Sequence, residues 1–123
     1  MAREIYDYQI ASAKPKFADD VLNVRKSSYD VKLQNEVLLI KRGTGVTTVG
    51  INLLSPKEVD GRRLLVKNVG TSADAITLTA PIVTRADGST YQSMIDGAIT
   101  KVINTGYAQV EIISDGEHYS IIR

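Results

Sequence analysis

The feature that most constrains how this chain can fold is a period-two alternation of apolar and more polar side chains. Ala108, Val110 and Ile112 alternate in this way within residues 107–112. The same pattern recurs in residues 49–53, 63–67 and 76–79. Because successive side chains of a strand point to opposite faces of a sheet, the pattern predicts half-buried β-strands.

Turn residues divide the chain into short strands of this kind. We expect strands at residues 21–25, 29–33, 36–41, 46–54, 62–68, 75–80, 90–95, 98–103, 107–113 and 118–122. Four Asp-Gly pairs favour tight turns: Asp60-Gly61, Asp87-Gly88, Asp96-Gly97 and Asp115-Gly116. Helical candidates amount to one turn each, at 17–21 and 56–59. The sequence therefore predicts an all-β fold, an antiparallel β-sandwich or jelly-roll-like barrel over residues 21–123.

Composition narrows the class of protein. A chain of 123 residues with 43% apolar and 24% charged side chains is expected to form one folded domain. It contains no cysteine, which excludes disulfides and thiolate metal sites. It has neither a transmembrane-length apolar run nor a signal-like start, so Sec export and membrane spanning are not expected. A formal net charge of +1 gives no general attraction to nucleic acid or membrane.

The first twenty residues differ from the rest. Tyr6, Tyr8 and Ile10 alternate, and a polar stretch interrupted by Pro15 follows. Such a segment cannot bury a core of its own. We interpret residues 1–20 as an extended N-terminal arm that docks as an edge strand or reaches a neighbouring chain. A terminus without fixed structure is the alternative.

The lone histidine, His118, lies in the stretch SDGEHYSII at residues 114–122. Strand-like residues flank Asp115-Gly116 on both sides, which favours a hairpin with the His118 ring exposed beside its turn. A zinc site needs three or four well-placed ligands, and a Ser-His-Asp triad with Ser114 or Ser120 would lack the usual nucleophile motif. We predict no catalytic residue, no metal site and no cofactor, and therefore no enzyme. A hydrolase would need activity that is lost on His118→Ala.

Other candidate binding motifs are explained equally well as ordinary loop or strand residues. The glycines of KRGTG (41–45) lack the phosphate-loop pattern and predict a hairpin loop between two strands. Arg63 and Lys67 fall on the solvent face of a strand whose inward residues are Leu64 and Val66, without the aromatic side chains that a base-stacking platform needs. No calcium-loop motif is present. Outward-facing tyrosines, Tyr91, Tyr107 and Tyr119, could bind sugar or simply cover a sheet.

Residues 61–122 resemble a series of motifs in virion proteins of tailed bacteriophages, which include capsid decoration proteins and fibre domains. The motifs are GRRLLVKNVG, AITLTA and GSTYQSMIDG, followed by the closing ISDGEHYSII. The upstream stretch VLLIKRGTGVTTVGINLLSP is similar to the strand pair that precedes them in that family. One departure is Tyr119, where the family often has tryptophan, and another is the lack of a long fibrous shaft.

The resemblance implies a structural protein of the virion without catalytic residues. Given the short chain, it favours a capsid decoration (cement) protein, made in the host cytoplasm, that binds the major capsid protein as a homotrimer. The alternative is a head- or tail-fibre or spike domain that recognises a host-surface glycan. We expect the arm to supply capsid or subunit contacts. The candidate residues are Tyr6, Tyr8, Ile10, Lys14, Lys16 and Phe17.

Residues 1–67 carry 12 Lys/Arg against 8 Asp/Glu, and residues 68–123 carry 3 against 6. These opposite charges could help set how copies of the subunit pack. Chance scatter of solvated side chains explains them equally well.

Overall fold

A computed structural model describes residues 21–123 of the protein. The expected arm and its six candidate contact residues lie outside the described residues. The regular secondary structure of these residues is β-strand apart from one 3₁₀ turn. Its elements are β1 (Val21–Val24), β2 (Ser28–Asp30), β3 (Val37–Ile40), β4 (Val49–Asn52), the 3₁₀ turn η1 (Pro56–Glu58), β5 (Arg63–Asn68), β6 (Ile76–Thr79), β7 (Ile82–Thr84), β8 (Thr90–Gln92), β9 (Thr100–Ile103), β10 (Gln109–Ser114) and β11 (Tyr119–Ile121).

The all-β prediction is confirmed, and each of the ten predicted strands overlaps a strand of the structure. The prediction missed β7, because its apolar residues follow Pro81 directly after β6. The candidate turn at residues 56–59 is the 3₁₀ turn η1. No helix within residues 21–123 is both long and apolar enough to cross a membrane.

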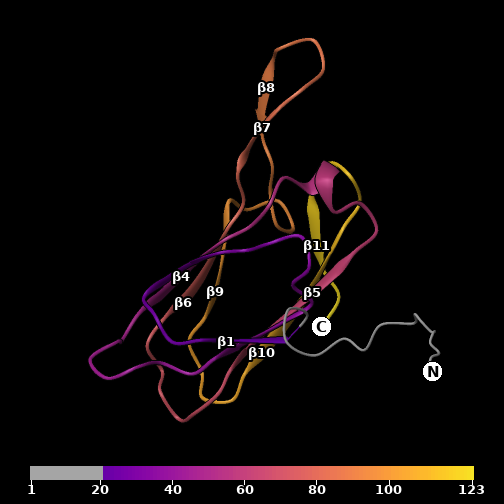
Figure 1. Cartoon of the computed structure of the whole chain (residues 1–123). Helices are drawn as coiled ribbons and strands as arrows, with labels where there is room; N and C mark the ends of the chain where they lie inside the picture. Colours follow the sequence, from indigo (N-terminus) through magenta and orange to yellow (C-terminus); the bar gives the residue numbers. More distant parts are fainter. Residues whose placement is uncertain (1–20) are drawn as a thin grey trace, which may run out of the picture.

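The strands form two main sheets and one small ribbon (Figure 1). One sheet has the order β1-β3-β5-β10-β11, and the other has the order β2-β4-β6-β9. The ribbon β7-β8 stands out from the body between β6 and β9. Buried side chains from both main sheets belong to one apolar cluster, so the sheets share a core.

Strand direction differs from the prediction. From β1 to β6 the chain alternates between the two sheets, and neighbours within each sheet run parallel. The chain thus winds in successive coils, one strand of each coil lying in each sheet. The antiparallel expectation is wrong for these six strands. The turn residues at 41–45 and 55–61 carry the chain across to the other sheet, so they do not close hairpins between neighbours.

The last strands are antiparallel, as predicted. β9 pairs with β6, β10 pairs with β5 and β11, and β7 pairs with β8. These strands are added to one side of the coils, so that β9 ends the smaller sheet and β11 ends the larger one.

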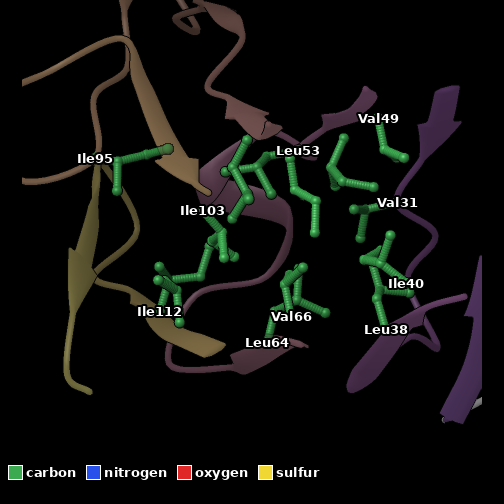
Figure 2. Close-up of a cluster of buried hydrophobic side chains, with 14 of the residues drawn as sticks. Val31, Leu38, Ile40, Val49, Leu53, Leu64, Val66, Ile95, Ile103 and Ile112 are labelled. Carbon is green, nitrogen blue, oxygen red and sulfur yellow. The ribbon is translucent and has the colours of Figure 1, made fainter. Parts of the chain in front are cut away.

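The predicted alternation places the core residues correctly. On β5, Leu64 and Val66 are buried, whereas Arg63 is exposed and Lys67 is half-buried. Register joins these residues across strands, with Leu38 beside Val66 and Val66 beside Val110. Figure 2 shows the resulting layer of aliphatic side chains from both sheets. Burial of this apolar surface is the main force that holds the coils together.

Candidate functional site

The turn at Asp115-Gly116 joins β10 to β11. It lies between Ser114 and His118, the two side chains considered above for catalysis. One Asp115 carboxylate oxygen, Oδ1, accepts the backbone N–H groups of Glu117 (2.9 Å) and His118 (2.8 Å). These two hydrogen bonds lower the pKa of the Asp115 carboxyl, with the one from His118 contributing most. Gly116 has a φ of +91°, which favours glycine at this position. The predicted hairpin turn is confirmed, and the Asp115 carboxylate stabilises it by hydrogen bonds to the backbone of the turn.

The His118 ring is positioned by one hydrogen bond and one aromatic contact. Its Nδ1 accepts the backbone N–H of Met94 at 3.1 Å, which leaves the proton of the neutral ring on Nε2. The ring meets Tyr91 edge-on, with centroids 5.6 Å apart. The side chain is therefore half-buried, and the expectation of an exposed ring is wrong. Tyr91 of β8 and Met94 just after it both contact His118. The local sequence could not predict either contact.

Ser114 is not placed as a nucleophile. Its buried hydroxyl donates to the carbonyl of Pro56 at 2.6 Å and accepts the N–H of Gly116 at 3.1 Å. A hydroxyl used in this way ties η1 to the end of β10. Within residues 21–123, no three His, Asp or Glu side chains gather so that they could hold a metal ion.

The other three Asp-Gly pairs also form turns, with different roles. At Asp96-Gly97 both residues have positive φ, +49° and +81°, and the flanking Ile95 and Ala98 exchange backbone hydrogen bonds of 2.6 and 3.0 Å. This is the geometry of a tight two-residue hairpin. Asp96 also accepts the N–H of Ile121 at 3.1 Å and so joins the hairpin to β11.

Asp87-Gly88 closes the β7-β8 ribbon. The Asp87 carboxylate accepts hydrogen bonds from the side chain and backbone N–H of Ser89, at 2.6 and 2.9 Å, and these lower the pKa of Asp87. Asp60-Gly61 lies at the end of the crossover from β4 to β5. There the N–H of Gly61 donates to the carbonyl of Ser114 at 2.9 Å. The structure thus brings Asp60 beside Gly116, and these two turns are neighbours in space.

The β7-β8 ribbon forms a projecting surface that the sequence did not indicate (Figure 1). Ile82 at its base is 68% exposed, the highest value among the large apolar residues described as exposed. The Arg85 guanidinium lies 4.3 Å from the centre of the Tyr91 ring. The Tyr91 hydroxyl donates to the carbonyl of Glu117 at 2.9 Å, and Lys57 donates to the carbonyl of Thr84 at 2.5 Å. The last two hydrogen bonds connect the ribbon to η1 and to the turn between β10 and β11.

The tyrosines do not form one outward surface. Tyr119 is only 5% exposed, and its hydroxyl donates to the carbonyl of Leu54 at 2.7 Å. The prediction that Tyr119 faces outward is therefore wrong, because β11 pairs with β10 in the register that turns this ring to the core. Tyr91 is half-buried, and Tyr107 is 57% exposed. Buried Tyr119 has a raised pKa, caused first by desolvation and then by the charge of Glu58.

Two exposed apolar side chains lie on or next to β9, the last strand of the smaller sheet. Val102 is 42% exposed and Ile99 is 49% exposed. Within residues 21–123, β9 pairs with β6 and has no neighbour on its other side. An edge strand with exposed apolar side chains is suited to contact with another protein. Alternation alone could not identify this site, because it does not say which strand lies at an edge.

The chain matches no family model, and the comparisons with curated proteins and with solved structures find no significant similarity to it.

Proposed function

We propose that the protein is a non-enzymatic structural protein of a bacteriophage virion. In this role it is a capsid decoration (cement) protein, a sandwich-type subunit that binds the outer surface of the shell as a homotrimer. The order of motifs in residues 61–122 supports the assignment to virion proteins of tailed bacteriophages. The observation that carries the role is the edge of β9, which has no partner on one side among the described strands and lies beside the exposed Ile99 and Val102.

An exposed sheet edge with apolar side chains is a liability for a single subunit, and association between copies covers it. A trimer would place several weak capsid contacts on one rigid body. Because linked contacts act with a high effective concentration, the assembly would bind the shell far more strongly than one subunit. The polar groups around His118 and Ser114 are engaged in internal hydrogen bonds, which suits a structural role.

The arm would extend these contacts toward the major capsid protein. Its candidate residues include Lys14, Lys16 and Phe17. Removal of residues 1–20 should weaken capsid binding while the circular dichroism spectrum keeps its β character. Equal binding by the shortened chain would show that the arm has no such role.

The experiment that tests the proposal changes Val102 to Lys. A charge at the β9 edge should reduce both the trimer mass measured by sedimentation and the amount of protein that co-sediments with shells of the encoding phage. Leu33→Lys is the matched control, since Leu33 is 51% exposed but lies in the loop between β2 and β3. A wild-type monomer that does not co-sediment with shells would overturn the proposal.

A second candidate function is a fibre or spike domain that recognises a host-surface glycan. The β7-β8 ribbon, which projects from the body (Figure 1), favours it, because the Arg85 guanidinium stacks on the Tyr91 ring there. The number of copies per virion separates the two functions. Hundreds of copies would support decoration, and a few dozen or fewer would support the fibre or spike.

A further inference from the structure

The four Asp-Gly pairs of the sequence share a chemical reactivity that depends on the geometry of their turns. In such a pair, the backbone nitrogen of glycine can attack Cγ of the preceding aspartate, because glycine has no side chain to obstruct the approach. The amide proton and the carboxyl hydroxyl leave together as water, and a five-membered succinimide ring forms. Water then opens the ring at either carbonyl, which restores aspartate or gives isoaspartate.

Exposure does not separate the four pairs, since Asp60, Asp87, Asp96 and Asp115 are all exposed. The pairs differ in the glycine N–H, whose nitrogen is the attacking atom. A hydrogen bond donated by this N–H keeps its proton in place and fixes the nitrogen within the turn. The turn must then open before the nitrogen can react.

Three of the four glycines donate such a hydrogen bond. The N–H of Gly61 donates to the carbonyl of Ser114 at 2.9 Å, and the N–H of Gly88 donates to the carbonyl of Arg85 at 3.0 Å. The N–H of Gly116 donates to the hydroxyl of Ser114 at 3.1 Å. The folded chain therefore protects these three pairs from ring formation.

Two of these pairs are protected in a second way, through the aspartate. Hydrogen bonds from the side chain and backbone of Ser89 lower the pKa of the Asp87 carboxyl. Hydrogen bonds from the backbone N–H groups of His118 and Glu117 lower the pKa of the Asp115 carboxyl. A carboxyl group that stays ionised resists attack, because its negative charge repels the nucleophile and its oxygen is a poor leaving group.

The fourth pair, Asp96-Gly97, forms the two central residues of the hairpin turn between Ile95 and Ala98. The peptide N–H between the two central residues of such a turn has no partner within the turn. Among residues 21–123, the N–H of Gly97 donates to no acceptor. Gly97 is also exposed, and no described heavy atom beyond its chain neighbours lies within 4 Å of an added Cβ. The attacking nitrogen is therefore accessible without any opening of the turn.

We propose that Asp96-Gly97 is the pair that isomerises in the folded protein, whereas the other three pairs react only after their turns open. The modification has a structural consequence. Asp96 donates its N–H to the carbonyl of Tyr119 at 3.0 Å and accepts the N–H of Ile121 at 3.1 Å. Isoaspartate adds one carbon to the backbone at this point, which displaces both groups and weakens the contact with β11. This inference does not rest on the proposed function.

Asparagine variants of the full-length chain test the proposal, because an amide side chain does not ionise and the carboxyl pKa no longer contributes. Asparagine forms the same ring with release of ammonia, so the reaction is measured as a mass change of the intact protein. Asp96→Asn should deamidate at least about tenfold faster than Asp60→Asn, whose glycine N–H is bonded to Ser114. In concentrated urea the two variants should react at similar rates, because neither turn persists.

The circular dichroism spectrum and the urea midpoint of each variant establish that both are folded under the conditions of the assay. Equal deamidation rates in the folded variants, or a faster rate in Asp60→Asn, would overturn the proposal. A difference that persists in urea would overturn it as well, because the cause would then be the local sequence and not the fold.

The wild-type protein supplies an independent readout. After prolonged incubation at mildly acidic pH, peptide mapping by mass spectrometry should find isoaspartate at residue 96 before it appears at residues 60, 87 or 115. Earlier modification of any of those three would contradict the assignment. The purified isoaspartyl form should also unfold at a lower urea concentration than the unmodified protein, and an unchanged midpoint would contradict the predicted weakening of the contact with β11.

Discussion

The two halves of the molecule connect their strands in different ways. From β1 to β6, each connection crosses from one sheet to the other, and the paired strands are parallel. From β7 to β11, paired strands are antiparallel, and tight turns close both the β7-β8 ribbon and the β10-β11 hairpin. Turn chemistry acts over a few residues and fixes hairpins locally. Parallel pairing joins residues far apart in the chain, so other contacts must fix it.

One such contact is centred on Asn68, at the end of β5. Its side chain is fully buried; the amide donates to the carbonyls of Ser72 (2.8 Å) and Thr105 (2.9 Å), and its oxygen accepts a hydrogen bond from Arg42 (2.8 Å). Arg42 also donates to the carbonyl of Asp74 at 2.6 Å. One buried amide therefore hydrogen-bonds to three loops and stabilises the coils at this end.

The largest effect is expected from Asn68→Ala. The change removes three part-buried hydrogen bonds, each worth about 0.5–1.5 kcal/mol, or more where a charged group takes part. We expect a loss of about 3 kcal/mol in the free energy of unfolding, measured by urea denaturation. Asn104→Ala is the control, because Asn104 is exposed and lies in the turn after β9. Equal losses for the two variants would show that the amide does not fix the coils.

Asn68 also shows what the sequence could and could not predict. It is in phase with Leu64 and Val66, so a polar residue at an inward position was a readable signal of a buried hydrogen-bonding group. Its partners come from residues 42, 72 and 105, and no local pattern names them. Strand positions and the Asp115 turn followed from alternation and turn chemistry. Strand direction did not, because parallel and antiparallel strands can share one inward pattern.

Tyr119 connects the two halves of the molecule. It lies on β11, and its hydroxyl donates to the carbonyl of Leu54, in the crossover between β4 and β5. Tyr119→Phe keeps the ring and removes this hydrogen bond. We expect a loss of about 1 kcal/mol at neutral pH, measured from the urea midpoint. Tyr107→Phe is the matched control, since Tyr107 is 57% exposed, and it should change the midpoint little.

The same pair of variants has a defined dependence on pH. The pKa of Tyr119 is raised above the ordinary value of 10.0 by burial and by the charge of Glu58. Above about pH 10 the unfolded chain releases this proton more readily than the folded one, so wild-type stability falls as the pH rises further. The advantage of the wild type over Tyr119→Phe should therefore shrink between pH 9 and pH 11. An advantage that grows over this interval would contradict the buried, protonated hydroxyl.

The smallest effect is expected from replacing single glycines by alanine. These substitutions distinguish a glycine in a turn from a glycine in a strand. Gly97 has a φ of +81° with nothing within 4 Å of an added Cβ, so Gly97→Ala tests backbone conformation alone. A left-handed conformation costs an L-residue about 1 kcal/mol, and we expect the urea midpoint to fall accordingly. Gly50, on parallel β4, is not in this region, and its added Cβ would meet Ser27 at 3.9 Å, an ordinary contact. Gly50→Ala should therefore be neutral or slightly stabilising, because alanine restricts the unfolded chain more than glycine does. If Gly50→Ala cost as much as Gly97→Ala, local turn geometry would not distinguish the hairpin half from the coiled half.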